Sequence, residues 1–130
     1  MIMIDTSVWV DFLHGVSAPH VETMEGCLEE SVGICVCGVI LMEVLQGIRD
    51  DKEYAETKAH LDALLFLPMG YTTFVRSADM YRSLRRKGIT IRKPVDCLIA
   101  SVCMEHDVLL LHNDRDFDPI EVHCGLRTIV

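Results

Sequence analysis

The sequence predicts an α/β fold, a single domain whose central sheet is mostly parallel and has four or five strands. Two observations predict it. Short apolar or β-branched runs alternate with amphipathic helical patterns along all 130 residues, and no repeat, low-complexity segment or linker interrupts them. Strands that alternate with helices form parallel sheets covered by helices on both faces. No apolar run approaches the ~20 residues that cross a membrane.

The first half of the chain begins with the apolar stretch Met1–Asp5. This stretch predicts a short buried strand that carries Asp5 to its C-terminal end. Thr6 or Ser7 is expected to cap the helix that follows. The other elements predicted here are a helix at His20–Glu30, a strand at Ser31–Val36, an apolar helix at Gly38–Ile48, a polar turn at Asp50–Glu53 and a helix at Tyr54–Phe66 with Leu61, Leu64 and Leu65 facing inward.

The second half continues the alternation. A helix capped by Thr72 or Thr73 is expected to end at Gly88, a residue type that favours helix C-termini. Its apolar stripe is predicted to be Phe74, Ala78, Tyr81 and Leu84. The other elements predicted here are a strand at Phe66–Met69, an irregular link at Ile89–Pro94, a buried helix at Asp96–Glu105, a strand at Val108–Leu111, a polar turn at Asn113–Pro119 and a final strand within Val122–Val130.

Basic residues gather in one part of an acidic chain. The net charge of −8 counts against simple nucleic-acid binding, which usually needs a basic surface. Seven of the twelve Lys and Arg residues nevertheless lie close together: Arg76, Arg82, Arg85, Arg86, Lys87, Arg92 and Lys93. Arg82, Arg85 and Arg86 share one helix face. That face is either a solvated surface or a site that holds phosphates.

The six cysteines form no CxxC pair and no zinc-finger spacing. Most of them lie inside apolar stretches. We therefore expect buried free thiols and a cytoplasmic protein.

Four acids have positions that need an explanation. Asp5 ends the first strand, Glu43 lies inside an apolar helix, Asp96 opens a buried helix, and Asp114 follows a strand. Taken singly, Asp96 is explained as a helix cap, Asp114 as a turn former and Glu43 as the partner of an arginine. Strand C-termini and helix N-termini share one edge of a parallel sheet, however, so the acids are expected to meet there.

Carboxylates that meet in one place repel one another and raise one another's pKa. Mg²⁺ or Mn²⁺, which prefer oxygen ligands, would relieve this repulsion. Such a site can generate a nucleophile from water and stabilise a departing oxygen in phosphodiester hydrolysis. If the basic face is not simply solvated, the residues expected to hold phosphates beside this acidic site are Arg82, Arg85, Arg86 and Lys87.

Taken together, the acids and the segments around them resemble a known family, the PIN domains of VapC-type toxins. The resemblance covers essentially the whole chain. Four segments carry it: Ile4-Asp5-Thr6-Ser7-Val8-Trp9, Glu43 in an apolar helix, Asp96-Cys97-Leu98-Ile99-Ala100, and Leu110-Leu111-His112-Asn113-Asp114-Arg115-Asp116-Phe117. Gly88, before the loop that leads to Asp96, also fits the type. One departure is His112, because many members carry a small hydroxyl residue at that position.

The resemblance implies a three-layer α/β/α sandwich and a Mg²⁺- or Mn²⁺-dependent endoribonuclease. It further implies a toxin that cuts structured RNA such as tRNA or rRNA, forms a homodimer and is silenced by a cognate VapB-type antitoxin. The family's metal-binding acids match Asp5, Glu43, Asp96 and Asp114, and a further acid of some members matches Asp116. Thr6 or Ser7 matches a hydroxyl position that orients the first acid or a water molecule on the metal.

Two other classes of function remain as alternatives. A catalytically silent PIN-fold binding module would keep the fold without needing all of these acids. An aspartate-based phosphatase or phosphotransfer domain would use Asp5 as the nucleophile. The phosphatase pattern requires a second acid where Ser7 stands, and a receiver domain requires a late lysine that the segment from His112 to Asp114 does not supply. His112 is expected to support the site rather than to act as a base.

Overall fold

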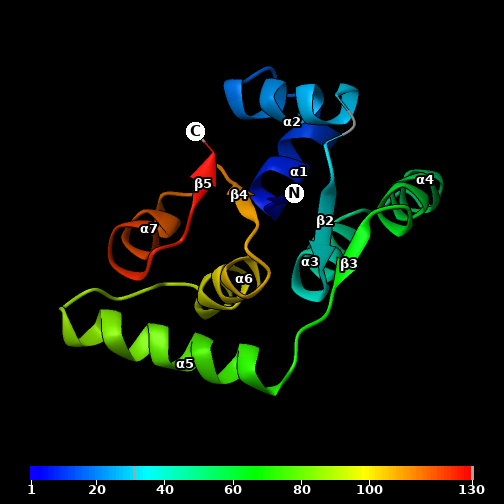
Figure 1. The fold of residues 1–130 in the computed structure, drawn as a ribbon. Coiled ribbons are helices and arrows are strands. Elements are labelled where there is room, and N and C mark those ends of the chain that lie inside the picture. The colour runs from blue at the N-terminus through cyan, green and yellow to red at the C-terminus, as the bar shows by residue number, and fades with distance from the viewer. Residues whose placement is uncertain (31, 130) are drawn as a thin grey trace.

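The computed structural model describes residues 1–30 and 32–129 of the chain. Five parallel strands form one sheet in the order β3-β2-β1-β4-β5, with the first strand at its centre (Figure 1). The predicted parallel α/β architecture is thus confirmed. The strands are β1 (Ile2–Ile4), β2 (Ile34–Cys37), β3 (Leu65–Leu67), β4 (Leu109–Leu111) and β5 (Thr128–Ile129).

The register of β1 and β4 decides where the acids lie. Ile4 pairs with Leu111, and the backbone N–H of Asp5 donates to the Leu111 carbonyl at 2.9 Å. Both strands therefore end at the same level. Asp5 follows β1 directly, and the segment with Asp114 and Asp116 follows β4, so both reach one edge of the sheet.

Helices cover both faces of this sheet. Figure 1 shows α6 between the long helix α5 and the sheet. Along the chain, α1 packs on α2 and α3, whereas α5 packs on α6 and α7. The helices are α1 (Thr6–Leu13), α2 (Pro19–Glu29), α3 (Gly38–Gln46), α4 (Asp51–Asp62), α5 (Tyr71–Arg86), α6 (Pro94–Glu105) and α7 (Asp118–Cys124), with a 3₁₀ turn η1 (Arg115–Phe117) before α7. None of the helices described is long and apolar enough to span a membrane.

The cap of α1 differs from the prediction. Asp5, rather than Thr6 or Ser7, is the N-cap, because its carboxylate accepts a hydrogen bond from the backbone N–H of Ser7. A carboxylate is favoured there by the positive end of the helix dipole. The same residue therefore ends the first strand, starts the first helix and lies at the edge where the acids meet.

The segment after α3 was also predicted incorrectly in part. The expected turn at Asp50–Glu53 is the start of α4, since the Asp50 side chain caps that helix through the backbone N–H of Glu53. The helix then ends at Asp62, and Leu65 belongs to β3. Leu65 is 53 % exposed rather than inward-facing, because β3 is an edge strand of the sheet.

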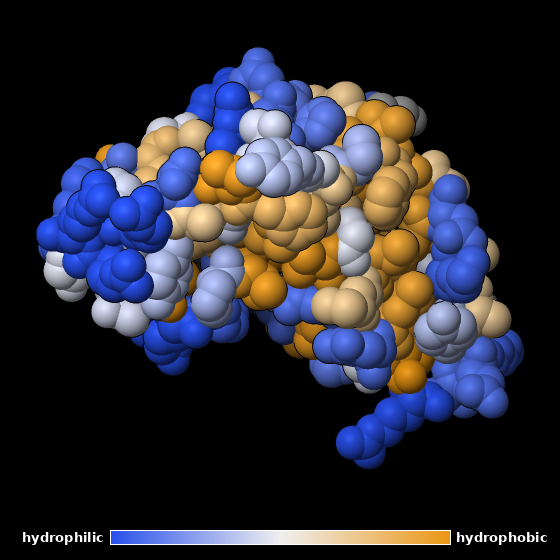
Figure 2. All heavy atoms as spheres, turned by 90° about the horizontal axis from the view of Figure 1, so that it is seen from below, coloured by the Kyte–Doolittle hydropathy of each residue, from blue (hydrophilic) through white to orange (hydrophobic). Residues whose placement is uncertain are grey.

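Helix α5 is capped by Gly70 rather than by a threonine. The Thr73 hydroxyl accepts a hydrogen bond from the backbone N–H of Gly70 at 3.1 Å, and Thr73 is itself buried. Leu84 is buried as predicted, but Phe74 is 53 % exposed. Figure 2, seen from the α5 side, shows apolar side chains gathered over the middle of the molecule and hydrophilic ones where α5 ends. Gly88 lies beyond that end with a positive φ of +79°.

The C-terminal third contains a helix that the sequence did not predict. The expected turn at Asn113–Pro119 becomes η1 and the first turn of α7, which is stabilised by burial of Phe117 and Ile120. Helix α6 starts at Pro94, two residues before the expected start. The strand expected at Ser31–Val36 is β2 and starts at Ile34, and the final strand expected within Val122–Val130 is β5. Ser31 and Val130, which belong to these predicted ranges, lie outside the described residues.

Candidate metal centre

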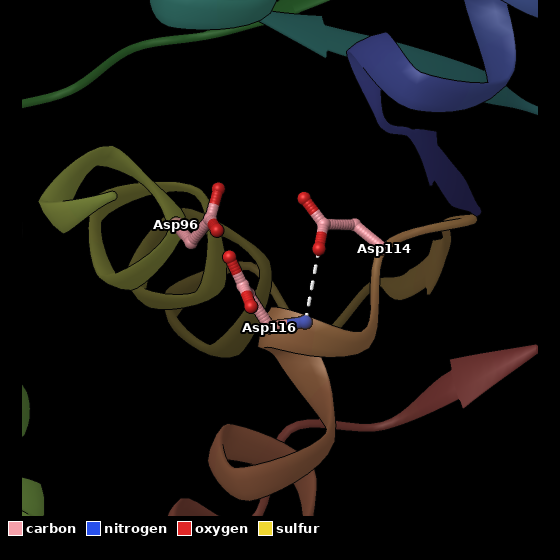
Figure 3. Close-up of side chains that lie close together, drawn as sticks. All are labelled: Asp96, Asp114 and Asp116. Carbon is pink, nitrogen blue, oxygen red and sulfur yellow. Dashed lines mark hydrogen bonds between the residues drawn. The ribbon is translucent and has the colours of Figure 1, made fainter. Parts of the chain in front are cut away.

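Three carboxylates from two parts of the chain converge at the carboxyl edge of the sheet. Asp96 comes from α6, whereas Asp114 and Asp116 come from the segment after β4 (Figure 3). One oxygen atom of each lies within 4.8 Å of those of the other two. Among the described residues, this is the group of acids close enough to share one ion, and it includes neither Asp5 nor Glu43.

Local structure fixes each of these three side chains. Pro94 occupies the first turn of α6, which places Asp96 in that turn beside the positive end of the helix dipole. Asp114 caps η1 and accepts a hydrogen bond from the backbone N–H of Asp116 at 2.9 Å. His112 supports the same turn, since its Nδ1 accepts from the backbone N–H of Asp114 at 3.1 Å and its ring packs on Phe117.

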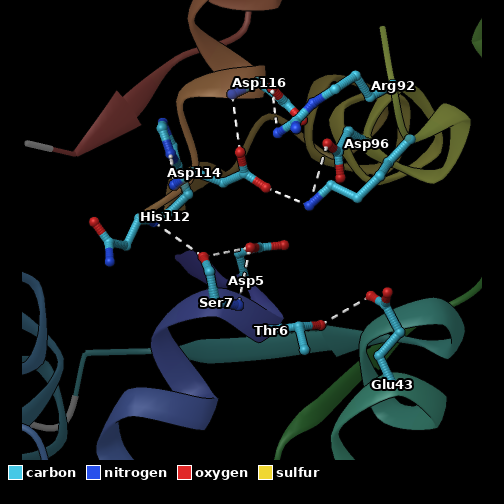
Figure 4. Close-up of polar contacts among 11 residues, drawn as sticks. Asp5, Thr6, Ser7, Glu43, Arg92, Asp96, His112, Asp114 and Asp116 are labelled. Carbon is cyan, nitrogen blue, oxygen red and sulfur yellow. Dashed lines mark hydrogen bonds and ion pairs between the residues drawn. The ribbon is translucent and has the colours of Figure 1, made fainter.

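Asp5 and Ser7 connect the first strand to this loop. The Ser7 hydroxyl donates to Asp5 Oδ2 at 2.5 Å and accepts from the backbone N–H of Asn113 at 3.0 Å (Figure 4). Asp5 is buried, with 5 % of its surface exposed. Ser7 thus holds the orientation of the first acid and, through Asn113, the position of the loop that carries two of the others.

Glu43 reaches the same edge by a different contact. Helix α3 brings its half-buried carboxylate to the Thr6 hydroxyl, which donates to Glu43 Oε1 at 2.9 Å. No ion pair to an arginine is found for Glu43 among the residues that the structure describes. The four predicted acids therefore line one edge, but Asp5 and Glu43 lie beside the tight group and Asp116 lies within it.

Two basic residues lie among the acids of the site, and the sequence did not predict their positions there. The Lys93 ammonium binds Asp114 Oδ2 and lies 4.0 Å from Asp96 Oδ2. The Arg92 guanidinium donates to Asp116 Oδ2 at 3.1 Å (Figure 4). One signal was available, because Lys93 precedes Asp96 by three residues at the start of a helix, a spacing at which side chains meet.

Burial and neighbouring charges give the three carboxylates different acidities. The pKa of Asp96 is raised from 3.8 to about 7, chiefly by burial; the charge of Lys93 opposes this rise, and the charges of Asp114 and Asp5 add to it. Burial acts in the same direction on Asp114, but the hydrogen bonds from Lys93 and Asp116 outweigh it and lower that pKa. The hydrogen bond to Asp114 raises the pKa of Lys93.

The donor set fits a hard divalent cation. All three groups offer carboxylate oxygens, the ligands that Mg²⁺ and Mn²⁺ prefer. Asp96 Oδ2 is buried and has no hydrogen-bond partner among the described residues. A buried oxygen without a partner is costly, and a cation shared with Asp114 and Asp116 would satisfy it.

A cavity lies at the site, and helix α5 carries an exposed basic surface. The cavity, of about 550 Å³, is lined by Arg92, His112, Asp114 and Asp116 among others. The predicted RNA-binding residues Arg82, Arg85, Arg86 and Lys87 are all exposed on α5 or just after it. None of these four has an ion-pair partner within the described part of the chain.

Comparison with known proteins agrees with this geometry. A family model described as "PIN domain" matches residues 2–122. Ribonuclease VapC11 of Mycobacterium tuberculosis is 37% identical over 122 residues, which cover 92% of this chain and 91% of that protein. Ribonuclease VapC18 of the same species is 26% identical over 128 residues, which cover 96% of this chain and 90% of that protein.

Solved structures share the fold at lower identity. DNA-bound VapBC from Salmonella typhimurium matches with a TM-score of 0.80 at 20% identity, over 98% of this chain and 96% of that one. M. tuberculosis VapC20, described as a sarcin-ricin loop cleaving toxin, matches with a TM-score of 0.68 at 14% identity, over 92% and 94% of the two chains. The fold, the edge where the acids gather and the similarity to the VapC ribonucleases lead to one conclusion: the chain belongs to the PIN-domain family.

Proposed function

We propose that this protein is a metal-dependent endoribonuclease, the toxin of a VapBC-type toxin–antitoxin pair. The observation that carries the proposal is the convergence of Asp96, Asp114 and Asp116 at the edge where Asp5 and Glu43 also lie. The 37% identity to a VapC ribonuclease over nearly the whole chain supports the same reaction class.

The acids divide into two groups in the proposed site. Asp96, Asp114 and Asp116 would hold Mg²⁺ or Mn²⁺, with Asp5 and Glu43 completing the site directly or through water. When bound, the cation would act as a Lewis acid, which generates a nucleophile from water and stabilises the departing oxygen of the phosphodiester. Ser7 keeps Asp5 in place, and Thr6 does the same for Glu43.

The RNA backbone would be held by the exposed basic surface at the end of α5. The acids give the site a strongly negative potential, which repels phosphates unless cations lie nearby. We define the α5 patch as Arg82, Arg85, Arg86 and Lys87. The proposed substrate is a structured RNA such as tRNA or rRNA.

The proposed partners are a VapB-type antitoxin and a second copy of the chain. A groove of about 480 Å³ extends from Glu43 along apolar side chains that include Val10, Leu13, Val44 and Ile48. An antitoxin tail with apolar residues and a basic group would fit there. The proposed compartment is the cytoplasm, in agreement with six free cysteines, five of them buried.

The decisive variant is Asp96→Asn, which keeps the shape of the side chain and removes its charge. The purified wild-type chain is expected to cut RNA with Mg²⁺ or Mn²⁺ and to stop when a chelator is added. Asp96→Asn is expected to lose at least ~100-fold in rate, because a site that loses one charged ligand no longer holds the cation well. A denaturing gel of the RNA fragments measures both effects.

The same variant tests the toxin assignment in cells. Expression of the wild-type chain alone should arrest growth, whereas Asp96→Asn or co-expression with a cognate VapB-type antitoxin should permit growth. If Asp96→Asn cut RNA at the wild-type rate, the shared-metal site would be wrong. If the wild-type chain bound RNA without cutting it under any metal condition, the silent binding module would be the correct assignment.

A further inference from the structure

Lys93 lies within the carboxylate group, although an ammonium does not bind metal ions. Its Nζ donates to Asp114 Oδ2 and lies 4.0 Å from Asp96 Oδ2. These two residues supply two of the three carboxylates whose oxygens lie within 4.8 Å of one another. The ammonium therefore binds the oxygens to which the proposed function assigns the cation.

Asp114 Oδ2 cannot bind the Lys93 ammonium and a divalent cation strongly at the same time. A divalent ion on Asp114 Oδ2 would lie within a few ångströms of the ammonium, and two positive charges at that distance repel strongly in a partly buried site. The lysine is free to move away. Half of its side chain, 51 %, is exposed, and its four-carbon stem is flexible enough to carry the charge into water without a change in the backbone.

We propose that Lys93 is an internal competitor of the divalent cation. The ammonium is seated on Asp114 and Asp96 until the cation replaces it, so Lys93 sets the cation concentration at which the site fills. This inference rests on the proposed function, because it requires that these acids bind the metal. Arg92 has a smaller role, since its guanidinium lies on Asp116 at the rim and its side chain is 78 % exposed.

The test is a direct measurement of Mn²⁺ binding to the purified full chain by isothermal titration calorimetry. A pH of about 8 keeps Asp96 ionised, because its pKa is raised to about 7. The variant Lys93→Met keeps the length of the stem and removes the charge. We expect it to bind Mn²⁺ about tenfold more tightly, the change that corresponds to removal of one charge-assisted hydrogen bond.

Two further variants separate local competition from net charge. Lys93→Arg keeps the positive charge at the same position and is expected to bind Mn²⁺ with an affinity close to that of the wild type. Lys58→Met changes the net charge by the same amount as Lys93→Met, but Lys58 lies on α4 and pairs with Asp62. Its exposed charge is screened by salt, so Mn²⁺ affinity should stay unchanged.

The possible results are distinct. Tighter Mn²⁺ binding by Lys93→Met alone supports the competitor role. Equal affinity of Lys93→Met and Lys58→Met, or weaker binding by Lys93→Met, would overturn it while the metal site itself stands. Absence of Mn²⁺ binding in every form, with folding verified by circular dichroism, would reject the metal-dependent function and this inference with it.

Discussion

At the scale of single residues, Asp96 has the least favourable electrostatic position in the candidate site. Only 3 % of its surface is exposed, and one of its oxygens has no hydrogen-bond partner among the described residues. Burial disfavours the charged form and raises the pKa to about 7. The folded state therefore retains a proton on Asp96 at pH values where the unfolded chain has lost it.

This retained proton predicts how stability depends on pH. The folded pKa lies above the unfolded one, so the stabilising contribution is complete below about pH 4 and is lost as the pH rises through about 7. Without added metal, the free energy of unfolding of the wild type is expected to fall by on the order of 2–4 kcal/mol relative to that of Asp96→Asn across this pH window. The lowered pKa of Asp114 has the opposite sign, but its contribution is lost only in more acidic solution.

Thermal melts in chelator across this pH range measure the difference. Asp96→Asn should be more stable than the wild type at about pH 8, because the amide does not titrate and carries no charge. Added Mg²⁺ should restore the stability of the wild type but should not stabilise Asp96→Asn. Parallel pH curves for the two proteins would contradict the raised pKa of Asp96.

The positions of the acids could be predicted, whereas those of the basic partners could not. Asp5, Asp96 and Asp114 each follow a strand or open a helix, and parallel strands place such residues at one edge. Lys93 lies within the predicted irregular link, where no periodicity indicates the direction of a side chain; its spacing of three residues to Asp96 indicates that contact but not the one to Asp114. Asp116 belongs to the tight group because η1 turns its side chain back toward Asp114, and that short turn has no clear sequence signal.

At the scale of the elements, α5 presents the α5 patch to solvent. The guanidinium of Arg85 lies over the Tyr81 ring, 5.7 Å from its centre, which fixes part of this surface. We expect Arg82→Glu combined with Arg86→Glu to weaken RNA binding and to reduce the salt slope of binding by about one for each phosphate that the variant no longer binds. Filter binding at several salt concentrations measures both quantities.

A matched control lies on another helix. Lys52→Glu with Lys58→Glu changes the net charge equally, but these residues belong to α4, away from the α5 patch. This control should weaken RNA binding far less at physiological salt, because exposed charges act over about 8 Å there. Equal losses in the two double variants would assign the effect to net charge and remove the α5 patch from the proposed function.

The elements themselves were predicted well where hydrophobic periodicity is strong and poorly where polar residues dominate. The run from Val108 to Leu111 and the apolar helix after Gly38 were assigned correctly, since both are rich in apolar residues that lie in or against the hydrophobic core. Helix α7 was missed because its first turn is polar and contains Pro119. Burial of Phe117 and Ile120 against the rest of the fold, a tertiary effect, stabilises it.

At the scale of the whole molecule, exposed apolar side chains lie close together in the sequence. They occur on β3 and on the first turns of α5, and they are Leu65, Phe66, Tyr71, Phe74 and Val75. Apolar surface that stays exposed in a monomer favours association. We therefore propose that the homodimer buries this region, which we call the β3–α5 face.

The prediction is that Phe74→Glu converts a dimer into a monomer without loss of folding. A carboxylate placed in a contact that excludes water has no partner there, so its burial costs free energy and weakens the dimer. Val122→Glu is the control, since Val122 is 75 % exposed but lies on α7. Sedimentation velocity should find the control dimeric. A dimeric Phe74→Glu variant would place the interface elsewhere, and a monomeric wild type would reject the homodimer.

The hydrogen bond between Ser7 and Asn113 joins residues 106 positions apart in the chain. The carboxylate group likewise needs Asp114 and Asp116, which the ribosome adds long after β1. The β1 strand obtains its β4 neighbour only after that late segment has emerged, because contacts distant in sequence form last during translation. A polypeptide that has not yet been extended through Asp116 therefore lacks the assembled carboxylate group, so the proposed metal site forms only after β4 and the segment that follows it have been made.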